Sequence, residues 1–252
     1  MPRRTFIAIV VIALAHAAFF ITYQRPDWDV AWTDQGGYKQ LGAGMARSGG
    51  AFTRFPDSPV FIPEVIRTPG YPAFVAVIYR LFGEQTLPVV IAQAFVFALI
   101  CVAAFALAQR VAGERAATIA AFMVALFPPL PYYAALVLTE LWTTFVLTIA
   151  MLVCMRALQH GRTRQFILAG VLFSATTLVR PAFILLPFGL AIAMPILVPS
   201  ERSGKRIGQW AVLALAAALT MAPWFTYNYV YLGRFTLSPA GGIGRGLWEG
   251  SW

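Results

Sequence analysis

The stretch LPVVIAQAFVFALICVAAFALAQ, residues 87–109, decides the fold because it is apolar and holds no charged side chain over its whole length. The hydrocarbon core of a bilayer is about 30 Å thick, so a helix that crosses it needs about 20 apolar residues. This stretch is long enough, and we therefore predict that it crosses a membrane as one α-helix.

The rest of the chain has the same character. Of its 252 residues, 60% are hydrophobic and 12% are charged, and the mean hydropathy is +0.72. A soluble domain is about half apolar and about one quarter charged. The sequence therefore predicts an all-α, polytopic membrane helix bundle that forms a single domain over residues 1–252 and has the lipid bilayer as its partner. We expect about seven transmembrane helices, near residues 5–23, 87–109, 116–136, 141–158, 165–181, 182–199 and 210–230. The fifth and sixth are short or joined through Pro181, so one of them is expected to be tilted or broken.

The formal net charge of +9 is explained by topology. One side of the predicted bundle holds the basic residues Arg3, Arg4, Arg110, Arg115, Arg156, Arg162, Arg164, Arg202, Lys205 and Arg206, with only Glu114 and Glu201 as acids. The other side mixes Arg25, Lys39, Arg47, Arg54 and Arg67 with Asp27, Asp29, Asp34, Asp57 and Glu64. Because cytoplasmic loops carry the excess of Lys and Arg, the amino terminus is expected in the cytoplasm. The basic excess thus orients the helices, and no nucleic-acid partner is expected.

The N-terminal segment is interpreted as a retained helix. Its apolar run of about 19 residues exceeds the 7–15 residues of a signal-peptide core, and no small-residue cleavage site is obvious after Tyr23. Cys101 and Cys154 lie within predicted spans and are interpreted as small core residues. His16 and His160 cannot join a site on the outer side, so we interpret both as structural.

The predicted extracytoplasmic loop, residues 24–83, is the most unusual segment, because loops of this length are usually functional or disordered. Four side chains in residues 34–45 share one helical face: Asp34, Tyr38, Leu41 and Met45. Glycines in this stretch predict a helix that packs closely on a neighbour or brings its backbone close to a ligand. The second piece, YPAFVAVIYRLFG at residues 71–83, is too short to span a bilayer and predicts an interfacial or re-entrant helix.

Four ionisable residues from separate parts of the sequence are expected at similar depth on the outer side: Asp34, Arg67, Glu140 and Arg180. Charges near a bilayer are costly and often functional. Each also has a simpler interpretation. Asp34 could solvate a turn and Arg67 could be a loop charge, while Glu140 could favour a helix start beside the capping residue Thr139. Arg180 could extend to the interface from a helix end.

Several stretches together resemble the C-type (GT-C) membrane glycosyltransferases, the superfamily of aminoarabinose and mannosyl transferases that use polyprenyl-phosphate sugars. They are TDQGGYKQLGAGMARSGGAF and IRTPGYPAF, then ALFPPLPYYAALVLTELW, LAGVLFSATTLVRP and APWFTYNYVYLGRF followed by GG. The resemblance implies a bacterial inner-membrane enzyme that moves a sugar from a polyprenyl-phosphate donor to an extracytoplasmic acceptor. Because relatives are longer, it also implies that this chain corresponds to their N-terminal part.

The resemblance also implies residue roles. Asp34 matches the family's catalytic carboxylate, and Arg67 is expected near the donor phosphate. The remaining substrate-binding residues that it implies are Tyr38, Tyr71, Glu140 and Arg180. No cofactor is expected. A divalent cation shared by Asp34 and Glu140 is the alternative, because hard cations accept carboxylate oxygen.

This chemistry agrees with the residue types. A carboxylate can take the proton of an acceptor hydroxyl, and arginines suit the departing phosphate. One displacement would invert the anomeric centre. Two alternatives remain: a transporter or lipid-handling membrane protein, and an inactive glycosyltransferase remnant.

Overall fold

The computed structural model describes residues 1–25, 28, 34–55 and 57–238. Asp27 and Asp29 of the mixed-charge side lie outside the described residues. Within the described part, the elements are helices, and the only pairing of extended backbone is one bridge between Thr53 and Pro63. The elements are α1 (Arg3–Gln24), α2 (Asp34–Ser48), α3 (Gly70–Phe82), α4 (Thr86–Leu126), α5 (Pro129–Ala134), α6 (Thr139–His160), α7 (Thr163–Val179), η2 (Pro181–Phe183), α8 (Leu186–Leu197), η3 (Pro199–Glu201) and α9 (Gly204–Leu232).

The predicted class, an all-α membrane bundle, is confirmed. In the described part of the chain, α1, α4, α6 and α9 are long and apolar enough to cross a membrane. The segments Thr163–Val179 and Pro181–Leu197 are apolar but shorter. The predicted number of about seven spans stays a prediction.

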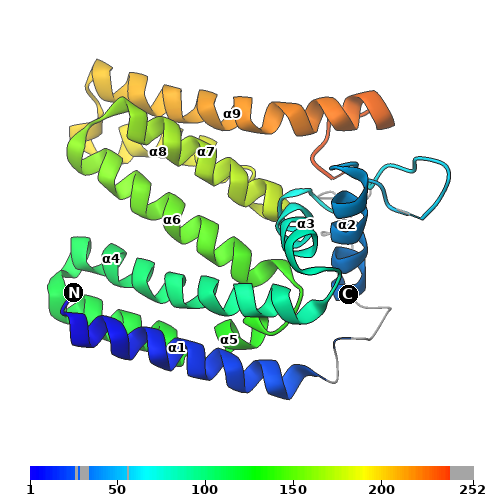
Figure 1. Cartoon of the computed structure of the whole chain (residues 1–252). Coiled ribbons are helices and arrows are strands. Elements are labelled where there is room, and N and C mark those ends of the chain that lie inside the picture. Colours follow the sequence, from blue (N-terminus) through cyan, green and yellow to red (C-terminus); the bar gives the residue numbers. More distant parts are fainter. Residues whose placement is uncertain (26–27, 29–33, 56, 239–252) are drawn as a thin grey trace, which may run out of the picture.

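Helix α4 is bent back on itself at Gly113. A straight helix of its 41 residues would be about 60 Å long, twice the thickness of the hydrocarbon core. Gly113 has φ 80° and ψ −178°, a conformation open to glycine, and it separates two limbs, 86–112 and 114–126. Figure 1 shows the second limb returning beside α1. His16 Nδ1 of α1 lies 3.1 Å from the carbonyl oxygen of Ala125 there, so His16 is structural.

The span predicted at residues 116–136 is wrong in its second half. The helix stops at Leu126, and the short helix α5 follows. Phe127 has φ −76° and ψ 105°, because the residue before a proline is pushed out of the helical region, and Pro128 follows it. One of the two spans joined through Pro181 is expected to be tilted or broken. The helix is interrupted at their junction, since Arg180 is extended at φ −139° and ψ 111° between α7 and η2.

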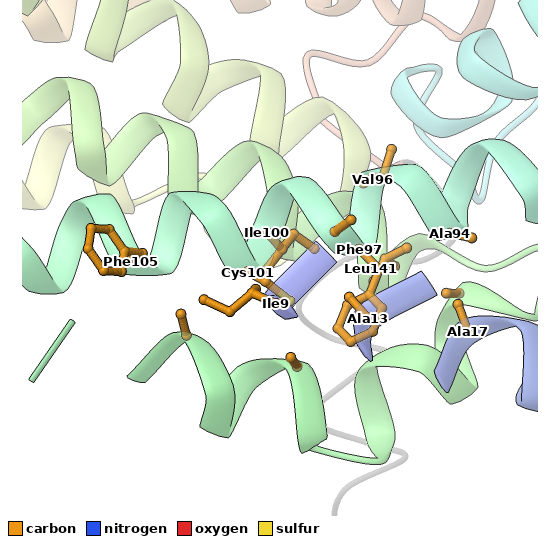
Figure 2. Packing of buried hydrophobic residues seen from close by; sticks show 14 of the residues in the cluster. Ile9, Ala13, Ala17, Ala94, Val96, Phe97, Ile100, Cys101, Phe105 and Leu141 are labelled. Carbon is orange, nitrogen blue, oxygen red and sulfur yellow. The ribbon is translucent and has the colours of Figure 1, made fainter. Parts of the chain in front are cut away.

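Small residues set the spacing of the bundle. Figure 2 shows Ala13 and Ala17 of α1 in the cluster that also contains Phe97 and Cys101 of α4. Between α7 and α9 the approach is closer, because a Cβ on Gly170 would lie 2.3 Å from the backbone oxygen of Leu213. Tight packing of this kind drives helix association in lipid. Cys101 and Cys154 are free and buried, as core residues.

The two predicted helices of the long loop are confirmed as α2 and α3. They lie together across one end of the bundle, which we call the α2/α3 end (Figure 1). A Cβ on Gly42 would lie 2.5 Å from Val75 Cγ1, so this glycine lets the two helices pack closely. Gly83, at φ 83°, ends α3 and donates its N–H to the carbonyl of Tyr79 at 2.9 Å. The start of α6 and the end of α7 reach the same end of the bundle.

Candidate active site

A cavity of about 230 Å³ lies at the α2/α3 end. Its walls come from four segments that are far apart in sequence: α2, the loop before α3, the start of α6 and the turn after α7. Five of the predicted site residues line it, namely Asp34, Tyr38, Arg67, Glu140 and Arg180. In the described part of the chain, the sixth predicted residue, Tyr71, is not part of the cavity lining.

Arg67 is the centre of one side of the cavity. Its Nη2 lies 2.9 Å from Asp34 Oδ1, and its guanidinium carbon stands 5.1 Å from the centre of the Tyr38 ring. The Arg67 side chain is only 18% exposed, whereas that of Asp34 is 76% exposed. The backbone of Gly37 passes directly beside the guanidinium, because a Cβ there would lie 2.6 Å from it. An acid that solvent can reach is thus paired with a largely buried arginine.

A second acid–arginine pair forms another part of the cavity wall. Arg180 Nη1 donates to Glu140 Oε1 at 3.2 Å. The other carboxylate oxygen of Glu140 is buried and has no hydrogen-bond partner among the described residues. The site therefore carries two carboxylates and two guanidinium groups around one small space, and the simple interpretation of Glu140 as a helix-start charge does not account for this pairing.

Neighbours of the site residues tie the four segments together. Gln35 Oε1 of α2 accepts the N–H of Val137 at 3.0 Å, just ahead of Glu140. Thr68 donates its hydroxyl to the carbonyl of Val179 at 3.3 Å, next to Arg180. Gln35 and Thr68 are both buried. They were missed by the sequence analysis, because single polar residues in a polar loop give no pattern.

Tyr71 lies one layer behind the cavity. It is fully buried and meets the Tyr38 ring edge-on, with the ring centres 5.2 Å apart. Its hydroxyl donates to Gln93 Oε1 at 2.8 Å, and Gln93 Nε2 donates to the carbonyls of Ala134 and Leu136 at 3.0 and 2.7 Å. Tyr71 therefore supports Tyr38 from behind and links α3, α4 and the loop before α6.

Tyr38 remains a neutral phenol at ordinary pH. Burial raises the pKa of Tyr38 above its usual value of 10.0, and the positive charge of Arg67 opposes this shift. A neutral ring carries no charge to compete with Asp34 for the guanidinium, and its face attracts the cation.

Among the described residues, no group of three or more His, Cys, Asp or Glu side chains is placed to hold a metal ion. Asp34 and Glu140 each face an arginine instead. The expectation that no metal is needed stays a prediction.

An apolar cavity of about 360 Å³ lies next to the site. Phe52, Trp224, Tyr227 and Tyr231 give it aromatic walls, and it reaches Leu178, two residues before Arg180. The polar end of a lipid-like group bound in this apolar cavity would thus lie close to the charged cavity.

Fold and site together define a polytopic membrane protein with a charged, arginine-bearing cavity at one end of the bundle. The sequence model of the dolichyl-phosphate-mannose-protein mannosyltransferase family matches residues 66–227, more than half of the chain. The chain belongs to this family, and so to the GT-C type of membrane glycosyltransferases. The match includes Arg67, Glu140 and Arg180 but not Asp34. Comparisons with curated proteins and with solved structures find no match.

Proposed function

We propose that the chain transfers a sugar from a polyprenyl-phosphate donor to an extracytoplasmic acceptor, with inversion at the anomeric carbon and Asp34 as the general base. The observation that carries this proposal is the cavity in which Asp34 and Glu140 face Arg67 and Arg180. Membership of the mannosyltransferase family supports the donor class.

The chemistry assigns one task to each charge type. Asp34 is the most exposed of the four ionic side chains, so an acceptor hydroxyl can approach it and lose its proton to the carboxylate. The acceptor oxygen then attacks the anomeric carbon from the face opposite the leaving phosphate. Arg67 and Arg180 stabilise the charge on that phosphate, because guanidinium groups pair with phosphate oxygens through two parallel hydrogen bonds.

Donor binding also prepares the base. Arg67 is paired with Asp34 at 2.9 Å. A donor phosphate competes with Asp34 for the same guanidinium, and its binding leaves the Asp34 carboxylate free to accept a proton. The same guanidinium therefore links the proposed base to the proposed phosphate site.

The apolar cavity beside the site fits the lipid part of such a donor. Its aromatic walls, together with Leu178 and Met45, suit an isoprenoid chain, and Leu178 lies two residues before Arg180. The α2/α3 end is assigned to the outside of the cytoplasm, because the basic loops belong to the opposite end. The family supports a cell inner membrane as the location. Ionic pairs at one end of the bundle favour this reaction over transport, for which charges near the middle of the membrane are typical.

The test is release of free polyprenyl phosphate from a panel of polyprenyl-phosphate sugars by the chain in lipid nanodiscs. We expect release by the wild type and a loss on the order of a hundredfold in Asp34→Asn, as for removal of a general base. Asp57→Asn is the matched control, because Asp57 is an exposed acid of the same loop that pairs with Arg47. Equal release by Asp34→Asn would exclude Asp34 as the base, and an inactive wild type would favour the remnant or transporter.

A further inference from the structure

Arg67 is carried to the cavity by an irregular segment. Residues 64–69 belong to no helix or strand. An arginine side chain has many rotamers, so its guanidinium stays at one place only if its backbone is fixed as well. The residue at the start of this segment, Glu64, is 1% exposed. A buried carboxylate is costly unless hydrogen bonds satisfy it.

The carboxylate of Glu64 is hydrogen-bonded to the backbone of Arg67. Glu64 Oε1 accepts the N–H of Ile66 at 2.7 Å and the N–H of Arg67 at 3.1 Å. Hydrogen bonds to an ionised acceptor are roughly twice as strong as neutral ones. The side chain of Glu64 therefore closes a turn and fixes the orientation from which the Arg67 side chain departs.

Two neutral contacts hold the same turn from other sides. Ser238 donates its hydroxyl to the carbonyl of Ile66 at 2.7 Å, and Thr68 donates to the carbonyl of Val179. Glu64 supplies the carboxylate anchor for the backbone at 66–67. Because Glu64 does not line the cavity in the described part of the chain, it acts there through the backbone of Ile66 and Arg67, and Arg67 is the charged one of the two.

We propose that Glu64 is a positioning residue, which holds Arg67 over Tyr38 and beside Asp34 so that its guanidinium is ready for an anionic group. This inference rests on the proposed function for the identity of that group, the phosphate of a polyprenyl-phosphate donor. The carboxylate is required, because glutamine keeps an acceptor oxygen but loses the charge that strengthens both bonds. Aspartate keeps the charge and readily accepts backbone N–H groups two residues on.

The experiment combines binding of polyprenyl phosphate with hydrogen exchange of the peptide that covers residues 65–70, both measured in nanodiscs. For Glu64→Gln we expect an unchanged melting temperature, about tenfold faster amide exchange in that peptide, and a Kd for polyprenyl phosphate raised about tenfold. Glu64→Asp should restore both to within about threefold. Glu84→Gln, which removes an exposed acid that pairs with Arg47, should change neither.

A double-mutant cycle separates positioning from a general structural role. In an Arg67→Ala background, Glu64→Gln should cause no further loss of polyprenyl-phosphate affinity, because Arg67 is the route through which Glu64 acts. Wild-type exchange and affinity in Glu64→Gln would overturn the proposal, as would an additional loss in the Arg67→Ala background.

Two other outcomes are also decisive. If Glu64→Gln does not fold, Ser238→Ala takes its place, since it loosens the same turn without a buried charge; unchanged exchange and affinity there would overturn the proposal. If the wild type binds no polyprenyl phosphate, the proposed function fails, and the exchange rates alone decide whether Glu64 holds Arg67.

Discussion

Gly37→Ala is a single-methyl change that tests whether the position of the Arg67 guanidinium matters. A Cβ on Gly37 would lie 2.6 Å from Cζ and Nη2 of Arg67 and 2.8 Å from Nη1, whereas ordinary contact begins at 3.4 Å. The guanidinium must therefore retreat by roughly 0.8 Å or more to restore ordinary contact. That shift breaks either the 2.9 Å contact of the guanidinium with Asp34 or its position over the Tyr38 ring.

The expected loss of polyprenyl-phosphate affinity in Gly37→Ala follows from the hydrogen bond that the displaced guanidinium loses. A hydrogen bond to a charged group contributes about 1.5–3 kcal/mol, so a misplaced guanidinium should weaken polyprenyl-phosphate binding about 10- to 100-fold. The fold should not suffer, because the obstructing atoms are the end of a flexible side chain. Alanine also raises helix propensity in α2 by about 1 kcal/mol relative to glycine.

The assay is the Kd for polyprenyl phosphate beside the melting temperature, measured for three glycine variants. Gly42→Ala should lower the melting temperature, because its Cβ would meet Val75 at 2.5 Å in the packed interface of α2 and α3. Gly189→Ala in α8 should leave affinity unchanged, because nothing lies within 4 Å of its Cβ. If Gly37→Ala binds polyprenyl phosphate like the wild type, the role assigned to the Arg67 guanidinium is refuted.

Three further variants test other parts of the structure. Gly170→Ala should lower the melting temperature by several degrees, because its Cβ would lie 2.3 Å from the backbone oxygen of Leu213, which cannot move aside; an unchanged melting temperature would contradict the close approach of α7 and α9. Tyr71→Phe removes the hydrogen bond to Gln93 and should cost about 1–2 kcal/mol of unfolding free energy, measured by denaturant titration, with polyprenyl-phosphate affinity nearly kept. A large loss of polyprenyl-phosphate affinity would instead show that Tyr71 takes part in substrate binding. Arg180→Gln should weaken polyprenyl-phosphate binding about tenfold at an unchanged melting temperature, and wild-type affinity would remove Arg180 from the phosphate site.

Most of the fold was predictable because lipid imposes length and composition on a helix. The apolar stretch at 87–109 lies in the first limb of α4, and the short helices α2 and α3 follow from the patterns of residues 34–45 and 71–83. The helix end at Leu126 was missed because hydropathy outweighed the local effect of Pro128 on Phe127. Hydropathy measures burial in lipid and is insensitive to the backbone conformation of one residue.

The residues of the site were predictable from the sequence, but their pairing in space was not. Asp34, Arg67, Glu140 and Arg180 share one cavity, as expected from their predicted depth. The pairing of each acid with its arginine depends on the orientation of α2 relative to the start of α6. The hydropathy pattern of the sequence does not determine that orientation. Glu64 was assigned only a charge, because its role arises from two backbone N–H groups that have no sequence signal.

The most direct test of the central claim is to measure turnover and polyprenyl-phosphate affinity together for Asp34→Asn. Asp34 competes with a phosphate for Arg67, so its neutral replacement should lose turnover on the order of a hundredfold while it binds polyprenyl phosphate as tightly as the wild type or more tightly. A variant that keeps its turnover, or that loses affinity and turnover in equal proportion, would contradict Asp34 as a base that the donor phosphate releases from Arg67.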